Sequence, residues 1–181
     1  MNTDGEPPAA QSVAVSTVGQ VLAGLASFGV EFVVIGGVAA ASLGSGMTTY
    51  GVDITPNRDQ RNLKRLARFL KSVDARLAVE DAPGGMEIPL DARLLAQFTN
   101  AAFDTTLGRI DCVFSPDGIP GGYRQLMKRA VTLEAFGIQF HAAHIDDIIA
   151  SKRAANRPKD QAAIPNLEAL AERRAERGLD Q

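Results

Sequence analysis

The feature that most constrains the fold is a strand pattern that runs directly into a helix through a pair of glycines. The stretch VEFVVIGG, Val30 to Gly37, is a run of β-branched and aromatic residues stopped by two glycines. Such a run is typical of a buried strand. The small residues that follow, VAAASLG, predict a short helix closed by Gly44.

Other patterned segments lie on both sides of this unit. STVGQVLAGLASFG carries apolar residues at helical spacing, with Ser16 as the predicted N-cap. The short apolar stretch VDIT, Val52 to Thr55, predicts a second strand. The segment after it, RDQRNLKRLARFLKSV, predicts an amphipathic helix whose apolar stripe is Leu63, Leu66, Phe69 and Leu70.

The second half of the chain predicts two hairpins and a closing pair of helices. The hairpins turn near Leu107-Gly108 and at Phe136-Gly137. DAPGGMEIP is predicted to be a loop and LDARLLAQF a short helix. The last helices are IDDIIASKRAAN and a longer one from about Asp160 to Arg177. This order indicates an α/β (α+β) domain, a mixed sheet flanked by helices with further helices at the C-terminus.

Length and composition favour one globular domain. Residues 1–14 lack periodicity and predict a flexible tail, which leaves 15–181 as a single domain. The net charge of −2 gives no global electrostatic reason to expect nucleic-acid binding. The single cysteine, the absence of a signal-peptide pattern and the lack of a long apolar run predict a cytoplasmic protein with no membrane partner.

Two carboxylates stand inside apolar strand patterns, where an unpaired charge is costly. Asp53 lies in VDIT and Asp111 in IDCVF. If the two strands are neighbours, both acids converge on one point and suit a hard cation such as Mg²⁺. The alternative is that one of them faces solvent at a sheet edge or pairs with Arg109 or Arg58. Spacing alone does not separate these hypotheses.

Phosphate-binding features accompany the acids. Gly36 and Gly37 open a helix, where free amides suit an anion, although a glycine pair alone favours a plain tight turn. The run SKRAANRPKD carries four cations, which either clamp a triphosphate or form a solvated face. His141 and His144 have no third ligand nearby and are predicted to be edge or capping residues rather than a zinc site.

Taken in order, these stretches resemble the minimal nucleotidyltransferase superfamily. The likeness is to small bacterial AbiEii-like proteins, the toxin partners in certain toxin–antitoxin and phage-defence pairs. It covers roughly Gly29 to Leu170. It rests on FVVIGGVAAASLG, TTYGVDITP with the Asn62-containing helix after it, GRIDCVF, and SKRAANRPKDQAAIPNLEAL.

The resemblance implies nucleotidyl transfer from an NTP with Mg²⁺ or Mn²⁺. Asp53 matches the second metal-binding aspartate of a D-x-D pair, and Asp111 matches a third aspartate that helps to activate the attacking hydroxyl. The positions that match residues near the nucleotide are Gly36, Gly37, Lys152 and Asp160. Paired metals would clamp the attacking and leaving oxygens while cations neutralise the triphosphate.

The implied acceptor is a hydroxyl of an RNA end, with tRNA the first candidate, or of a protein, and a cognate antitoxin is an implied partner. The helix that carries Arg58, Arg61, Lys64, Arg65 and Arg68 is one surface that would meet RNA. A solvated amphipathic helix is the alternative for the same residues.

The sequence departs from the family pattern at Gly51, where the first aspartate of the D-x-D pair is expected. Glycine offers no carboxylate, and losing one metal ligand costs affinity and geometry. Asp104 or Asp117 would have to substitute from a neighbouring segment. A catalytically degenerate member that acts as a nucleotide- or protein-binding module is therefore the alternative hypothesis, and Gly51→Asp would then restore metal binding or activity.

Overall fold

The structure is a computed structural model that describes residues 9–46 and 51–179, with side chains from residue 17 onward. The first half of the chain holds α1 (Ala9–Ser27), β1 (Phe32–Ile35), α2 (Gly36–Ser42), β2 (Gly51–Pro56), α3 (Gln60–Ser72), β3 (Arg76–Val79) and β4 (Ala82–Met86). The second half holds α4 (Ala92–Leu95), β5 (Asn100–Thr105), β6 (Gly108–Val113), α5 (Tyr123–Met127), β7 (Val131–Ala135), β8 (Ile138–Ala142), α6 (Ile145–Ala155) and α7 (Pro158–Glu176).

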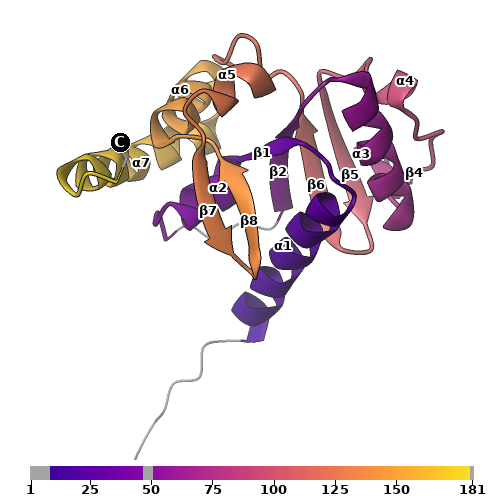
Figure 1. Cartoon of the computed structure of the whole chain (residues 1–181), viewed down its shortest axis with the longest axis horizontal. Coiled ribbons are helices and arrows are strands. Elements are labelled where there is room, and N and C mark those ends of the chain that lie inside the picture. Colours follow the sequence, from indigo (N-terminus) through magenta and orange to yellow (C-terminus); the bar gives the residue numbers. More distant parts are fainter. Residues whose placement is uncertain (1–8, 47–50, 180–181) are drawn as a thin grey trace, which may run out of the picture.

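The strands form one mixed sheet, as the sequence predicts. Its order is β4-β3-β5-β6-β2-β1-β8-β7. The β2–β6 and β1–β8 pairs are parallel, and the other neighbours are antiparallel. In Figure 1, α6 and α7 lie at one end of the molecule and α3 and α4 at the other, with β1, β2 and β6 between them.

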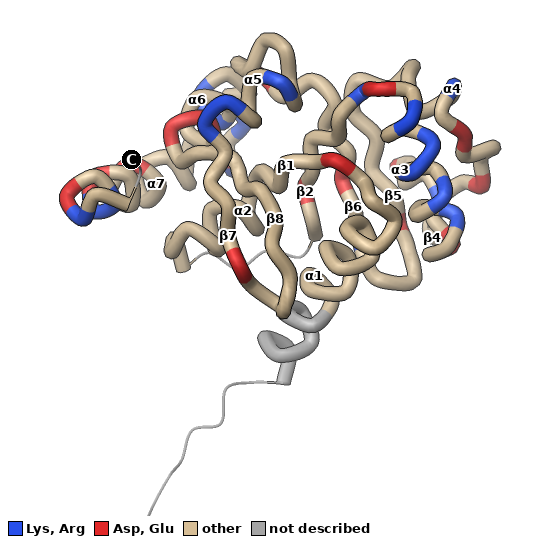
Figure 2. Tube along the Cα trace, viewed as in Figure 1, with Lys and Arg blue, Asp and Glu red and all other residues tan. Residues whose placement is uncertain are grey.

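The core explains why the two amphipathic helices form where they are predicted. In α1, Val21, Leu22 and Leu25 are fully buried, and in α3 the four stripe residues are all buried. The helices meet where the rings of Phe28 and Phe69 pack edge to face, 5.8 Å between centroids. Apolar residues at a spacing of three and four thus line the contact, while the basic residues of α3 are exposed or half-buried. Figure 2 marks their positions along the helix in blue.

Asn62 fixes the central pair of strands from its buried place on α3, where it is 1% exposed. Its side-chain oxygen accepts from the N–H of Glu31 at 2.7 Å. Its amide nitrogen donates to the carbonyls of Glu31 and Asn57, both at 2.8 Å. Because Glu31 precedes β1 and Asn57 follows β2, one side chain joins the backbone at the adjacent ends of the two strands.

Three local predictions are corrected or extended by the structure. Helix α1 begins at Ala9, so Ser16 lies inside it rather than at its N-cap, and residues 1–8 of the predicted tail lie outside the described residues. The stretch predicted as a loop at DAPGGMEIP contributes β4, which pairs with β3. Helix α7 begins at Pro158 and continues through Pro165.

Candidate functional site

The turn between β1 and α2 is built around Asp53. Gly36 has φ +64°, a conformation that side-chain-bearing residues rarely adopt. A Cβ atom placed on Gly36 would lie 2.4 Å from Oδ2 of Asp53. The N–H of Gly37 donates a hydrogen bond to the Asp53 carboxylate. The glycine pair therefore permits a close approach of carboxylate and backbone, and one of its amides is already used by the protein itself.

Asp53 and Asp111 stand directly beside each other. They are partners in the parallel β2–β6 ladder, where neighbouring strands are about 4.8 Å apart. Burial and, to a lesser extent, the charge of Asp111 raise the pKa of Asp53 to about 6, against the opposing effects of the Gly37 N–H, Lys152 and Lys159. The sequence predicts that the two acids lie together if their strands are neighbours, and the strands are neighbours.

Arg109 pairs with Asp111, which is the alternative that the sequence left open. Its Nε lies 3.3 Å from Oδ1 of Asp111, and its Nη1 lies 3.2 Å from Oδ1 of Asp104. Arg58, the other candidate partner, instead donates to the carbonyls of Ala96 and Phe98. Asp111 therefore has an acid on one side and a guanidinium on the other.

Lys152 and Asp160 meet at the junction of α6 and α7. Asn156, with φ 52°, ends α6 in the left-handed conformation and lets the chain turn. Asp160 is 1% exposed, and its carboxylate lies 2.9 Å from Nζ of Lys152 and 2.5 Å from Nε of Arg157. Burial opposes ionisation of Asp160, but the hydrogen bonds from Lys152 and Arg157 outweigh it and lower its pKa. Asp160 thus holds Lys152 in place.

A cleft of about 670 Å³ brings the separate features together. Every site residue predicted from the sequence lines it: Gly36, Gly37, Asp53, Asp111, Lys152 and Asp160. Lys159 and Arg109 line it too, as does Asp117, whereas Asp104 does not belong to its wall. The basic helix α3 contributes no residue to this wall. The hypothesis of an RNA surface on α3 therefore concerns a different part of the molecule.

The sequence reasoning missed one buried acid of the cleft wall. Asp147 is 8% exposed, lines the cleft and accepts from Nη2 of Arg129 at 2.7 Å. Acidic residues are common in the first turn of a helix, and Asp147 lies in the first turn of α6. Nothing in the local sequence therefore indicates a role in the cleft. His144 caps α6 by accepting from the N–H of Asp146, and this confirms the capping prediction.

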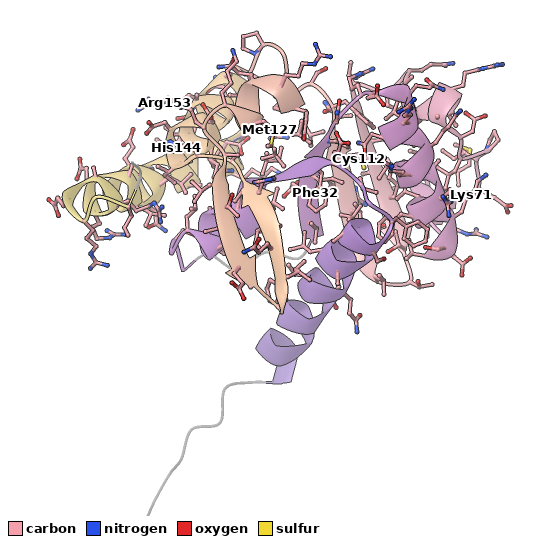
Figure 3. All side chains as sticks on the ribbon, in the orientation of Figure 1. Phe32, Lys71, Cys112, Met127, His144 and Arg153 are labelled. Atoms are coloured by element: carbon pink, nitrogen blue, oxygen red, sulfur yellow. The ribbon has the colours of Figure 1, made fainter. Side chains whose placement is uncertain are left out.

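Cys112 lies next to Asp111 in the chain and points to the other side of β6. It is fully buried, and Figure 3 labels it in the middle of the molecule. Burial, with the charge of Asp111, raises the pKa of its thiol well above the usual range. Cys112 is therefore a small core residue and not a nucleophile.

The acids of the cleft match in number the carboxylates that commonly hold one divalent cation. Mg²⁺ is commonly held by one or two carboxylates together with substrate phosphates and waters, and Asp53 and Asp111 supply that number. Across residues 9–46 and 51–179, no group of three or more His, Cys, Asp or Glu side chains is placed to hold a metal ion. Among these described residues, neither Asp104 nor Asp117 joins Asp53 and Asp111 in a three-ligand group that would replace the carboxylate missing at Gly51.

The fold is similar to that of an antibiotic adenylyltransferase. The lincosamide antibiotic adenylyltransferase LnuA, in a lincomycin-bound crystal structure, matches with a TM-score of 0.56 and 11% identity, over 86% of this chain and 96% of that one. This chain has a nucleotidyltransferase-like fold. The solution structure of the antibiotic-resistance factor ANT(2'')-Ia matches at 15% identity and a TM-score of 0.49, over 93% of this chain and 95% of that one. No protein-family model matches the sequence, and no curated protein matches it.

The described part of this nucleotidyltransferase-like chain contains no helix with the length and apolar character needed to cross a membrane. The predicted mixed sheet is confirmed, whereas the particular likeness to AbiEii-like proteins stays a prediction. The Gly51 position lies on β2, two residues before Asp53 and on the same face of the strand. Gly51 itself does not line the cleft, but its ladder partner Arg109 does.

Gly36→Ala is expected to destabilise the fold by roughly 2 kcal/mol, because the new Cβ is strained at positive φ and collides with the Asp53 carboxylate. Thermal unfolding measures the change. Gly137→Ala is the matched control, since Gly137 has φ +74° and no heavy atom within 4 Å of the added Cβ. Equal losses in both variants would mean that the contact with Asp53 contributes nothing beyond backbone strain.

Proposed function

We propose that this chain binds a nucleoside triphosphate in the cleft and transfers its nucleotidyl group to a hydroxyl acceptor. The observation that carries the proposal is the pairing of Asp53 with Asp111 at the wall of a cleft that Lys152 and Lys159 also line. Acids on one strand pair and cations on the helices form the arrangement that phosphoryl transfer requires. The nucleotidyltransferase-like fold supports it.

The lysines act on the triphosphate. Lys152 is held by Asp160 through a hydrogen bond of 2.9 Å, so its ammonium is positioned before a ligand arrives. Lys159 is exposed at the start of α7 and lies close enough to influence the charge of Asp53. Fixed cations at the site of charge development stabilise the transition state without reorganisation.

The acids would serve the metal and the acceptor. Asp53 and Asp111 are the residues that would hold a divalent cation such as Mg²⁺ or Mn²⁺, and that cation would stabilise charge on the phosphoryl oxygens. Asp111 is less buried than the core around it, with 32% of its side chain exposed. A carboxylate in this position is suited to orient the acceptor hydroxyl and take its proton.

The acceptor classes that we propose are an RNA end, with tRNA first, and a protein hydroxyl. LnuA was solved with lincomycin bound, so a small hydroxylated molecule is a further class to include in the test. A toxin-type role with a cognate antitoxin follows only from the resemblance to AbiEii-like proteins. A small antitoxin gene next to this one would support that role.

The proposal is tested by incubating the protein with Mg²⁺ or Mn²⁺, each α-labelled NTP, total cell RNA and lysate. We expect label on one species, and a loss of about 100-fold or more in Asp53→Ala, because a positioned carboxylate at the reacting group is worth that much. Asp81→Ala, in the exposed β3–β4 turn, is the control that should retain full transfer. Equal labelling by wild type and Asp53→Ala would refute the assignment.

A second candidate is a binding module that keeps the nucleotide and lacks the chemistry. Gly51 favours it, since the D-x-D position that would complete the metal site has no carboxylate. The same incubation separates the two candidates. Measurable NTP binding without transfer under any condition would support the module.

A further inference from the structure

Four positions form a small patch on the cleft side of the sheet. In the parallel ladder Gly51 is the partner of Arg109, and Asp53 is the partner of Asp111. Residues two apart on a strand share a face. One strand thus presents a glycine and an acid, and its neighbour presents an arginine and an acid.

Gly51 and Arg109 fit each other. A Cβ atom on Gly51 would lie 3.3 Å from both Cβ and Cγ of Arg109, and 3.3 Å from its carbonyl oxygen. Such contacts are tighter than most Cβ contacts, so Arg109 would have to shift by a few tenths of an ångström to accommodate a side chain. The missing side chain at position 51 therefore leaves room for the aliphatic stem of Arg109.

The guanidinium of Arg109 contacts two carboxylates, those of Asp111 and Asp104. Besides the 3.3 Å contact to Asp111, its Nη1 reaches Asp104 at 3.2 Å. Asp104 lies on β5, where it is the ladder partner of Arg109. The guanidinium, 45% exposed, is thus fixed between two carboxylates, and one of these belongs to the cleft.

We propose that Arg109 is a resident cation of the cleft, which neutralises Asp111 and restricts the site to one divalent ion. The inference rests on the proposed function only in taking this cleft as the phosphate site. A guanidinium keeps its charge at every physiological pH and donates hydrogen bonds to phosphate oxygens in a planar fork. It supplies positive charge where Gly51 supplies no metal ligand.

The proposal makes position 51 and position 109 interdependent. Gly51→Asp alone would crowd the stem of Arg109, and its carboxylate would pair with the guanidinium rather than with a metal. Arg109→Ala would free Asp111. Only the double substitution Gly51→Asp with Arg109→Ala would place three unpaired carboxylates on the patch.

The test is a Mn²⁺ titration of the nucleotide-free protein, followed by the electron paramagnetic resonance signal of free Mn²⁺. We expect one weak site in the wild type and about tenfold tighter binding in Arg109→Ala, because a nearby cation repels the metal. Arg109→Lys, which keeps the charge, should stay near the wild type. Gly51→Asp should still bind one ion and the double variant two.

Arg76→Ala is the matched control, since Arg76 also sits on a strand and pairs with an exposed acid, Glu87, at 3.9 Å. Its Mn²⁺ affinity should be unchanged. Two ions in the wild type, an unchanged dissociation constant in Arg109→Ala, or two ions in Gly51→Asp alone would each overturn the proposal. Circular dichroism confirms that each variant is folded.

Binding of a fluorescent NTP analogue, measured separately on the same proteins, keeps the two proposals apart. If the wild type does not bind the NTP analogue, the proposed function is refuted. The Mn²⁺ titration then still decides the role of Arg109. Normal nucleotide binding with no effect of Arg109→Ala on Mn²⁺ would refute the resident cation alone.

Discussion

Asp53→Asn is expected to raise the stability of the ligand-free protein and to remove its stabilisation by divalent cations. Burial and the neighbouring Asp111 raise the pKa of Asp53 from 3.8 to about 6. An acid whose folded pKa lies above its unfolded value is less easily ionised in the native state. The resulting penalty is absent below pH 3.8, grows as pH rises to about 6, and is constant above that.

Asparagine has no charge to bury, and its side-chain oxygen still accepts from the N–H of Gly37. We expect a gain of roughly 1–3 kcal/mol at neutral pH, or about 2–4 °C in Tm per kcal/mol for a domain of this size. The gain should vanish well below pH 3.8, where Asp53 is protonated in both states.

The measurement is differential scanning calorimetry at acid and neutral pH, with EDTA or with Mn²⁺. Wild type should gain Tm on adding Mn²⁺, because an ion that binds only the folded state stabilises it, whereas Asp53→Asn should not. Asp81→Asn removes an exposed acid and should change neither value. A lower Tm in Asp53→Asn at neutral pH would show that the carboxylate stabilises the fold and that its repulsion by Asp111 is small.

Asp160→Asn is expected to destabilise the protein by roughly 3 kcal/mol at neutral pH, because it leaves Lys152 beside a buried amide instead of its counter-charge. The pKa of Asp160 is lowered below 3.8 by Lys152 and Arg157 against the effect of burial. An acid whose pKa is lower in the folded state than in the unfolded state stabilises the fold at pH values above its unfolded pKa. This contribution is lost as the pH falls through the folded pKa. The difference between wild type and variant should therefore shrink in acid.

Urea unfolding across this pH range measures the effect. Glu168→Gln is the matched control, since Glu168 on α7 pairs with Arg153 on α6, but both side chains are exposed. An exposed pair is worth at most about 1 kcal/mol. If Asp160→Asn costs no more than Glu168→Gln, Asp160 is not the anchor of Lys152. Weaker NTP binding by the folded Asp160→Asn protein would follow from a less well positioned ammonium.

The parts of the fold that follow from local pattern were predictable, and those that depend on distant partners were not. The stripe Leu63 to Leu70 and the turn at Phe136-Gly137 require only spacing and turn chemistry. Strand β4 contains Pro83 and two glycines and lies at the sheet edge. Such a segment becomes a strand only because β3 pairs with it, so its own sequence indicates a loop.

The site shows the same division. The sequence identified Asp53 and Asp111 as acids in apolar strands, yet their adjacency depends on a parallel pairing between strands far apart in the chain. The pairing of Asp111 with Arg109 could be predicted from the sequence, because Arg109 stands two residues earlier on the same strand and therefore on the same face. Asp147 had no such signal, since its partner Arg129 comes from another segment.

The hydrogen bonds of Asn62 hold the two central strands together independently of the side chains that line the cleft. They fasten β1 and β2 through backbone groups at Glu31 and Asn57, and they use no side chain of the cleft. Substitutions on the cleft side of the strands can then accumulate without loss of strand alignment. None of these hydrogen bonds involves position 51, so the Asn62 contacts do not depend on which side chain stands there.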